Sequence, residues 1–152
     1  MTLLYDSFIN NKRTTMPPSG FSVDRDTLND QLFDFQKDIV RWALRRGRAA
    51  ILAGTGTGKT REQIEWAMNV HKLSGGDVLL LAPLAVAAQT VSEGAKLGYE
   101  ITLCRNQNDV KPGLNITNYE MLPHFEPILF DGVVLVCRNV RYLLKERFDS
   151  GD

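Results

Sequence analysis

The sequence predicts an α/β fold of three layers, in which helices cover both faces of a central and mainly parallel sheet. Short apolar runs alternate with segments of helical periodicity along most of the chain. Strands that are apolar throughout are typical of parallel sheets buried on both faces. A glycine-rich loop also lies between one such run and the next helical segment, an arrangement that recurs in α/β folds.

The composition allows one domain with its own hydrophobic core. The chain has 152 residues, of which 43% are hydrophobic and 24% are charged, as is ordinary for globular proteins. The 18 basic residues balance the 18 acidic ones, so net charge creates no field toward DNA or a membrane. No apolar run has the length of a membrane span, and no secretory signal is visible. Cys104 and Cys137 predict reduced thiols, and we expect a cytoplasmic protein.

The N-terminal part predicts an arm and then a helix. Residues 1–26 are expected to form the arm, because Pro17, Pro18 and Gly20 interrupt any periodic pattern. The helix is expected from an N-cap at Asp30 to the arginines around Gly47. Its apolar side chains recur at helical spacing, at Leu32, Phe35, Ile39 and Ala43.

Strands and helices are then expected to alternate. Residues 49–53 predict a buried strand at the centre of the sheet, and residues 60–73 predict the helix after the loop. Residues 77–82 predict a second buried strand, followed by a helix over 84–97. The remaining expected elements are strands at 100–104 and 114–117, a helical turn at 119–124 and a last strand within 128–136.

Residues 138–152 form either an amphipathic helix or a solvated tail. Helical spacing favours the helix, with an apolar stripe at Val140, Leu143, Leu144 and Phe148. Such a stripe would have to be buried on the chain's own sheet, on a second copy or on a foreign partner.

The glycine-rich loop carries the strongest chemical signal. It consists of Gly54, Thr55, Gly56, Thr57, Gly58, Lys59 and Thr60. Its glycines let backbone N–H groups approach phosphate oxygens, and the next helix directs its positive end at the same anion. Lys59 is expected to contact the β- and γ-phosphates, and the Thr60 hydroxyl is expected to bind magnesium. The loop therefore predicts a site for ATP or ADP with Mg²⁺, although Ala53 stands where the common form begins with glycine.

Together with neighbouring segments, this loop resembles the first RecA-like domain of superfamily 2 helicases, especially the Swi/Snf-like enzymes of phages and prophages. The matching segments are residues 53–60 for motif I, 32–36 for the Q motif, 80–84 with Gln89 for motif Ia, 115–120 for motif Ib and 130–135 for the strand that leads into motif II. The resemblance covers residues 28–135 and implies a RecA-like P-loop domain over residues 27–137.

The resemblance also implies roles for residues outside the loop. Gln36 occupies the place of the glutamine that reads the adenine edge. The segments after two predicted strands would touch a nucleic-acid backbone weakly, through Pro83, Leu84, Thr117 and Asn118. DNA binding is thus expected to be weak at most.

One departure from the family concerns its catalytic acids. The family has an Asp-Glu pair directly after the strand that leads into motif II, but this chain has Val136 and Cys137 there. Neither side chain binds a hard cation or accepts a proton as a carboxylate does, and Asp131 lies at the other end of the strand. We therefore expect no catalytic residue here, and a single lobe without a second domain to supply an arginine finger would not be active alone.

Two functions from different classes follow. The first is a phage-derived nucleotide-binding lobe, in the cytoplasm of a bacterial host, that binds ATP or ADP without efficient hydrolysis. The second is a viral interaction protein that uses a degenerate helicase lobe to inhibit a host or defence helicase or nuclease. Both readings allow a monomer or a homodimer, and neither involves a membrane.

Overall fold

A computed structural model describes residues 7, 17–51, 56, 58–136 and 140–144 of the chain. Its α-helices are α2 (Asp34–Arg46), α3 (Lys59–Ser74) and α4 (Leu84–Lys96). Its strands are β1 (Arg48–Ile51), β2 (Asp77–Leu81), β3 (Ile101–Leu103), β4 (Leu114–Thr117), β5 (Phe130–Leu135) and β6 (Val140–Leu144). Short 3₁₀ helices are η1 (Arg25–Thr27), η2 (Gln107–Asp109), η3 (Tyr119–His124) and η4 (Pro127–Leu129).

The strands form one sheet in the order β1-β6-β5-β2-β4-β3. The four strands β5, β2, β4 and β3 are parallel, whereas β6 is antiparallel to both β5 and β1. β1 therefore points in the same direction as the parallel strands. The predicted α/β class with a central, mainly parallel sheet is confirmed.

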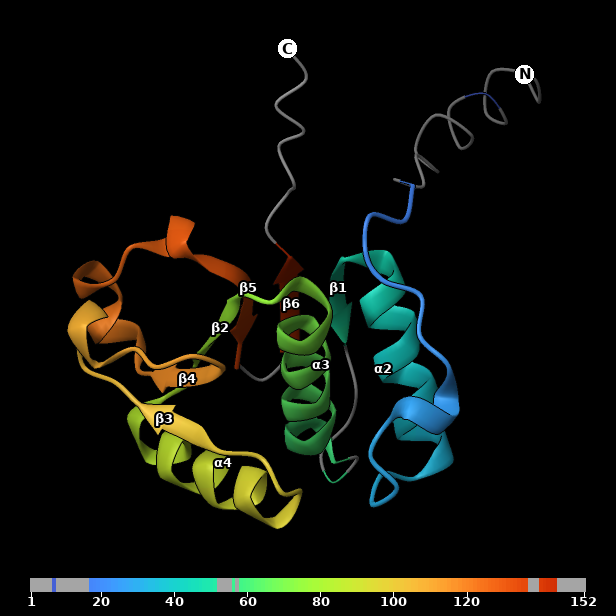
Figure 1. The fold of residues 1–152 in the computed structure, drawn as a ribbon, viewed down its shortest axis with the longest axis horizontal. Helices are drawn as coiled ribbons and strands as arrows, with labels where there is room; N and C mark the ends of the chain where they lie inside the picture. Colours follow the sequence, from blue (N-terminus) through green and yellow to red (C-terminus); the bar gives the residue numbers. More distant parts are fainter. Residues whose placement is uncertain (1–6, 8–16, 52–55, 57, 137–139, 145–152) are drawn as a thin grey trace.

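Different layers cover the two faces of the sheet (Figure 1). Helices α2, α3 and α4 share one hydrophobic core with the side chains of Val78, Leu80, Leu114, Ile116 and Val134. The opposite face packs Leu79 and Leu81 against residues of the segment 104–130, which contains η2, η3 and η4. The third layer is thus made of 3₁₀ turns and loops around Cys104, Phe125 and Phe130.

The position of β1 corrects one expectation. The strand was expected at the centre of the sheet, but it is the first strand in the order, and its described part ends at Ile51. Only β6 pairs with β1 among the described residues, in a register that joins Ile51 to Val140 and Arg48 to Leu143. The strand that precedes the glycine-rich loop is therefore held to the sheet by the C-terminal segment.

The C-terminal helix is a second correction, because residues 140–144 form strand β6 instead. β1 and β5 run in the same direction with one strand position between them, and their facing backbone groups need partners. A strand of opposite direction supplies hydrogen bonds to both neighbours, which a helix cannot do. Residues 137–139 and 145–152 lie outside the described residues, and Phe148 is among them.

Within the predicted arm, residues 19–21 contact the end of α2. The backbone N–H groups of Gly20 and Phe21 donate to Arg45 O and Leu44 O, at 3.2 and 2.8 Å, at the C-terminal end of α2. Helix α2 itself begins four residues after the expected cap at Asp30, because the Gln36 side chain accepts a hydrogen bond from Phe33 N at 2.9 Å and so caps the helix there. Leu32 is buried ahead of the helix, whereas Phe35, expected in the apolar stripe, is exposed.

No helix in the described ranges is long and apolar enough to cross a membrane.

Candidate phosphate-binding site

The predicted loop connects the end of β1 to the start of α3. Of its members, Gly56, Gly58, Lys59 and Thr60 are described, whereas Gly54, Thr55 and Thr57 lie outside the described residues. Gly56 and Gly58 have φ angles of 80° and 76°, in the left-handed region that favours glycine. Gly58 is the N-cap of α3, and the helix begins at Lys59. The glycines therefore turn the chain directly into the helix.

The first turn of α3 has the properties of an anion site. The N–H groups that open a helix have no partner within it, and the helix dipole places partial positive charge there. α3 has 16 residues, and Lys59 and Thr60 are its first two. Because β1 is parallel to β2, β4 and β5, this turn belongs to the carboxyl edge of the sheet, where open α/β folds bind ligands.

Gln36 connects α2 to this loop. Its side chain is only 2% exposed, and a Cβ atom at Gly58 would collide with its amide nitrogen. The structure thus brings Gln36 next to the loop. Contact between Gln36 and an adenine base remains a prediction. The Gln36 amide is buried in this structure, and its oxygen accepts a hydrogen bond from Phe33 N.

Two aromatic side chains beside Gln36 were not predicted as site residues from the sequence. Phe33 and Phe35 are 66% and 51% exposed, and their rings stack with centroids 6.0 Å apart and an interplanar angle of 13°. The sequence signal that could have identified them is a pair of aromatic residues, two positions apart, directly before a glutamine. Their exposure could not be predicted, because helical spacing had placed Phe35 in the core.

Glu62 is the other site residue that the sequence did not reveal. It lies in the first turn of α3, its side chain is 0% exposed, and neither carboxylate oxygen has a hydrogen-bond partner among the described residues. Burial raises the pKa of Glu62 to about 7, and the nearby positive charge of Lys59 acts in the opposite direction. The adjacent Gln63 is also buried, and its Oε1 has no hydrogen-bond partner in the part of the chain that the structure describes.

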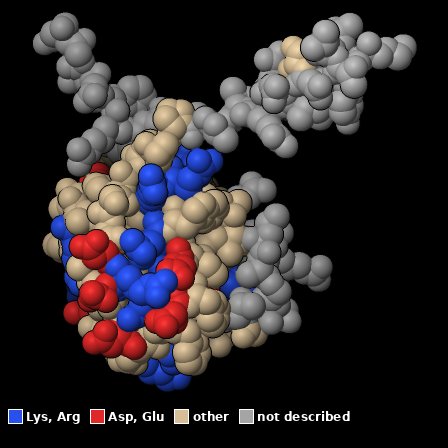
Figure 2. Space-filling model, turned by 90° about the vertical axis from the view of Figure 1, so that its right-hand side faces the viewer, with Lys and Arg blue, Asp and Glu red and all other residues tan. Residues whose placement is uncertain are grey.

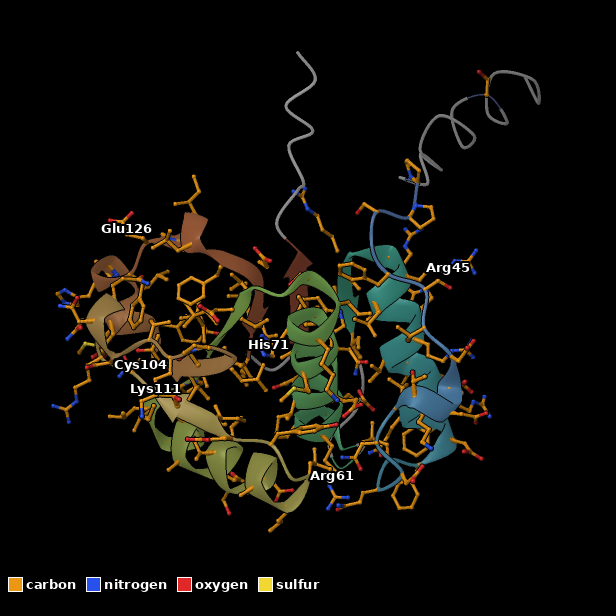
Figure 3. All side chains as sticks on the ribbon, viewed as in Figure 1. Arg45, Arg61, His71, Cys104, Lys111 and Glu126 are labelled. Carbon is orange, nitrogen blue, oxygen red and sulfur yellow. The ribbon has the colours of Figure 1, made fainter. Side chains whose placement is uncertain are left out.

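Arg61, also in the first turn of α3, contacts two neighbouring segments. Its Nε lies 3.6 Å from Glu93 Oε2 of α4, and its Nη1 donates to Gln31 O at 3.4 Å. Figure 3 shows Arg61 at the end of α3 where the helix begins. Arg61 therefore ties α3 both to α4 and to the segment before α2.

The predicted nucleic-acid residues lie together at the carboxyl edge but are not equally accessible. Leu81 pairs with Thr117, and Ala82 N donates to Thr117 O at 3.0 Å, so Pro83 and Asn118 follow neighbouring strand ends. Leu84 is 72% exposed, whereas the Thr117 side chain is buried. The Asn118 side chain caps η3 by accepting from Met121 N at 3.0 Å. Contact with nucleic acid remains a prediction.

The end of β5 carries no acid in its described part. Val136 N donates to Leu81 O at 2.7 Å, and Val136 O accepts from Tyr119 Oη at 2.6 Å. Cys137 lies outside the described residues. Asp131 is at the start of β5, where a Cβ atom at Gly76 would collide with its carboxylate. The prediction that Asp131 lies at the opposite end of the strand from Val136 is confirmed.

Magnesium fits the chemistry of the first turn of α3. Mg²⁺ prefers oxygen ligands, keeps several waters, and is commonly held by one or two carboxylates together with substrate phosphates. Thr60 offers a hydroxyl, and Glu62 offers a buried carboxylate whose oxygens have no partner in the described residues. No group of three or more His, Cys, Asp or Glu side chains suited to a metal occurs in the described part of the chain.

Cys104 is a buried thiol remote from the loop (Figure 3). Its Sγ lies 3.5 Å from Asn115 Oδ1 and 3.4 Å from Asp109 O. Burial, with a smaller contribution from Asp109, raises the pKa of Cys104 to about 11, so the thiol is protonated and unreactive at neutral pH.

Opposite charges are mixed on the face formed by α2 and the residues before it (Figure 2). Arg25 forms an ion pair with Asp38, and Lys37 Nζ lies 3.7 Å from Asp30 Oδ1. This face therefore lacks the single sign of charge that favours a nucleic-acid backbone. Comparisons with protein-family models, curated proteins and solved structures found no match to the chain.

Proposed function

We propose that this chain binds ATP or ADP with Mg²⁺ at the loop between β1 and α3. The supporting observation is the path of the backbone: two glycines with positive φ lead directly into a 16-residue helix whose first residue is Lys59. Backbone N–H groups, the helix dipole and a lysine then act on one phosphate group. The loop holds only the phosphate end of the nucleotide, so we expect a Kd in the micromolar to millimolar range.

Calorimetry and thermal unfolding with ATP, ADP and Mg²⁺ test this proposal. Nucleotide at 100 times its Kd stabilises a folded protein by about 2.7 kcal/mol, which a shift in Tm reports. Lys59→Ala should abolish both the heat and the shift. Lys111→Ala, at an exposed lysine that lies far from Arg61 and the first turn of α3 (Figure 3), should retain both. Absence of heat and shift at millimolar nucleotide would refute the proposal.

We further propose that bound ATP is hydrolysed slowly or not at all. Positioning of the attacking water by a carboxylate is part of phosphoryl transfer in related folds, and Val136 offers none. Phosphate release should therefore stay at background with and without DNA or RNA. Release that disappears in Lys59→Ala but persists in Lys111→Ala would contradict this expectation.

A further inference from the structure

Glu62 is a buried acid to which the described residues donate no hydrogen bond. Both of its carboxylate oxygens are unpartnered in the described residues, as is Oε1 of the adjacent Gln63. A carboxylate removed from water needs a cation or hydrogen-bond donors to remain charged. By contrast, Glu65 on the same helix receives hydrogen bonds from Asn29 N, Asn69 Nδ2 and Tyr99 Oη. Of these two buried acids of α3, Glu62 is thus the one to which the described residues donate no hydrogen bond.

The positive charge that acts on Glu62 comes from the start of the same helix. Lys59, one turn earlier on α3, is the charged group that acts on it. The hydrophobic core shared by α3 and its neighbours includes Leu44, Leu80, Ile116 and Val134. The buried Gln36 amide, which carries no charge, lies beside the start of the helix. If Lys59 engages a phosphate, Glu62 remains ionised only beside another cation and otherwise takes up a proton. A divalent ion bound with the nucleotide is such a cation.

We propose that Glu62 anchors the Mg²⁺ ion of the bound nucleotide, together with the Thr60 hydroxyl. Helical side chains point back toward the N-terminus of their helix, so a carboxylate in the first turn of α3 is directed toward the loop end. Val136 provides no carboxylate from the end of β5, and Glu62 would provide one from the helix side of the same edge. This inference rests on the proposed nucleotide binding.

The test compares nucleotide affinity with and without metal in the full chain. ATP and ADP binding is measured by calorimetry in Mg²⁺ and in EDTA, for the wild type, Glu62→Gln, Glu62→Asp and Glu126→Gln. Glu126 is exposed and lies far from Arg61 in Figure 3, so Glu126→Gln is the matched control. Each variant's own affinity in EDTA is its reference. In Glu62→Gln, the tightening of ATP binding by Mg²⁺ should fall by about 10-fold or more.

A second experiment measures the bound metal directly. Mn²⁺ replaces Mg²⁺, and electron paramagnetic resonance measures the Mn²⁺ bound in the presence of ATP. We expect it to be lost in Glu62→Gln, partly retained in Glu62→Asp and unchanged in Glu126→Gln. Equal metal dependence in the wild type and Glu62→Gln would overturn the role of Glu62 while leaving nucleotide binding intact. A wild type that binds no nucleotide under any condition would overturn both proposals.

Discussion

Burial of Glu62 links the stability of the fold to pH. Its pKa is raised from 4.5 to about 7, so the folded state holds the proton more tightly than the unfolded state. The resulting contribution to stability is complete at pH values below the pKa of Glu62 in the unfolded state. It declines as pH rises toward 7 and is lost above pH 7. By pH 8, a shift of this size lowers the free energy of unfolding by an amount on the order of 3 kcal/mol.

Glu62→Gln should therefore be more stable than the wild type at pH 8, by up to that amount, and similar to it at pH 5. Urea unfolding in EDTA at the two pH values measures the difference. Glu126→Gln should follow the wild type, because its carboxylate is exposed. Parallel pH profiles for the wild type and Glu62→Gln would show that Glu62 ionises freely in the folded protein.

Gly56 and Gly58 allow backbone strain to be separated from a steric clash. Both have positive φ, but a Cβ at Gly56 meets nothing within 4 Å, whereas one at Gly58 collides with the Gln36 amide. Gly56→Ala should cost about 1–2 kcal/mol in unfolding free energy from strain alone. Gly58→Ala should cost clearly more, and part of the excess should disappear in a Gln36→Ala background. Equal costs in thermal or urea unfolding would contradict the contact between Gln36 and Gly58.

At the same scale, the sequence predicted the loop residues but not their buried neighbours. Glycine, lysine and threonine at fixed spacing indicate phosphate binding by themselves, because their chemistry is local. The burial of Glu62 and the exposure of Phe35 depend on where α2 and α3 rest on the sheet. Helical spacing alone placed Phe35 in the core, because it gives a face but not the neighbour that covers it.

Among the elements, β6 gives the clearest test of the sheet topology. Tyr142 pairs with Ala49 of β1 and with Val134 of β5, so the strand is internal to the sheet. Proline in an internal strand removes a ladder hydrogen bond and clashes with the pairing. Tyr142→Pro should cost about 3 kcal/mol or more in unfolding free energy. Tyr142→Thr retains the N–H group and should cost much less; equal costs would show that the side chain, not the strand, matters.

The sequence favoured a helix for these residues for an identifiable reason. Val140, Leu143 and Leu144 have the spacing of one helical face, but a five-residue segment is too short for periodicity to decide between helix and strand. The deciding factor is the open strand position between β1 and β5, which is a property of the whole sheet. Longer elements such as α3 and β2 were predicted within a residue of their bounds, because their apolar patterns span the complete element.

Across the whole molecule, Glu65 joins segments that are distant in sequence. Its carboxylate accepts hydrogen bonds from Asn29 N at 3.0 Å, Asn69 Nδ2 at 3.0 Å and Tyr99 Oη at 2.8 Å. Burial raises the pKa of Tyr99 to about 12, so its hydroxyl remains a donor. One buried side chain thus connects the segment before α2, helix α3 and the residues that lead into β3.

Removing this connection should destabilise the fold as a unit. Glu65→Ala leaves several buried donors unsatisfied and should cost at least about 3 kcal/mol, whereas Tyr99→Phe removes one charge-assisted hydrogen bond and should cost about 1.5–3 kcal/mol. Urea unfolding followed by circular dichroism and by fluorescence measures both. If the two signals separate in Glu65→Ala, the segments unfold independently and the connection is weaker than the geometry indicates.

The α/β class could be predicted because apolar strands and amphipathic helices alternate along the chain. The order of strands could not, since a sequence pattern specifies which face of an element is apolar but not which neighbour it takes. The prediction that the sheet centres on residues 49–53 was wrong for this reason, whereas the predicted strand at 114–117 was confirmed with its bounds.

The pairing of β1 with β6 has a consequence for native-state fluctuations. In the described part of the chain, β1 reaches the sheet only through β6, so an opening that releases β6 also releases the strand that leads into the glycine-rich loop. The two strands then form one cooperative unit in hydrogen exchange. A ligand held by the loop would raise the free energy of this shared opening. The amide protons of residues 140–144 would consequently exchange more slowly when the loop, which lies far from them in sequence, is occupied.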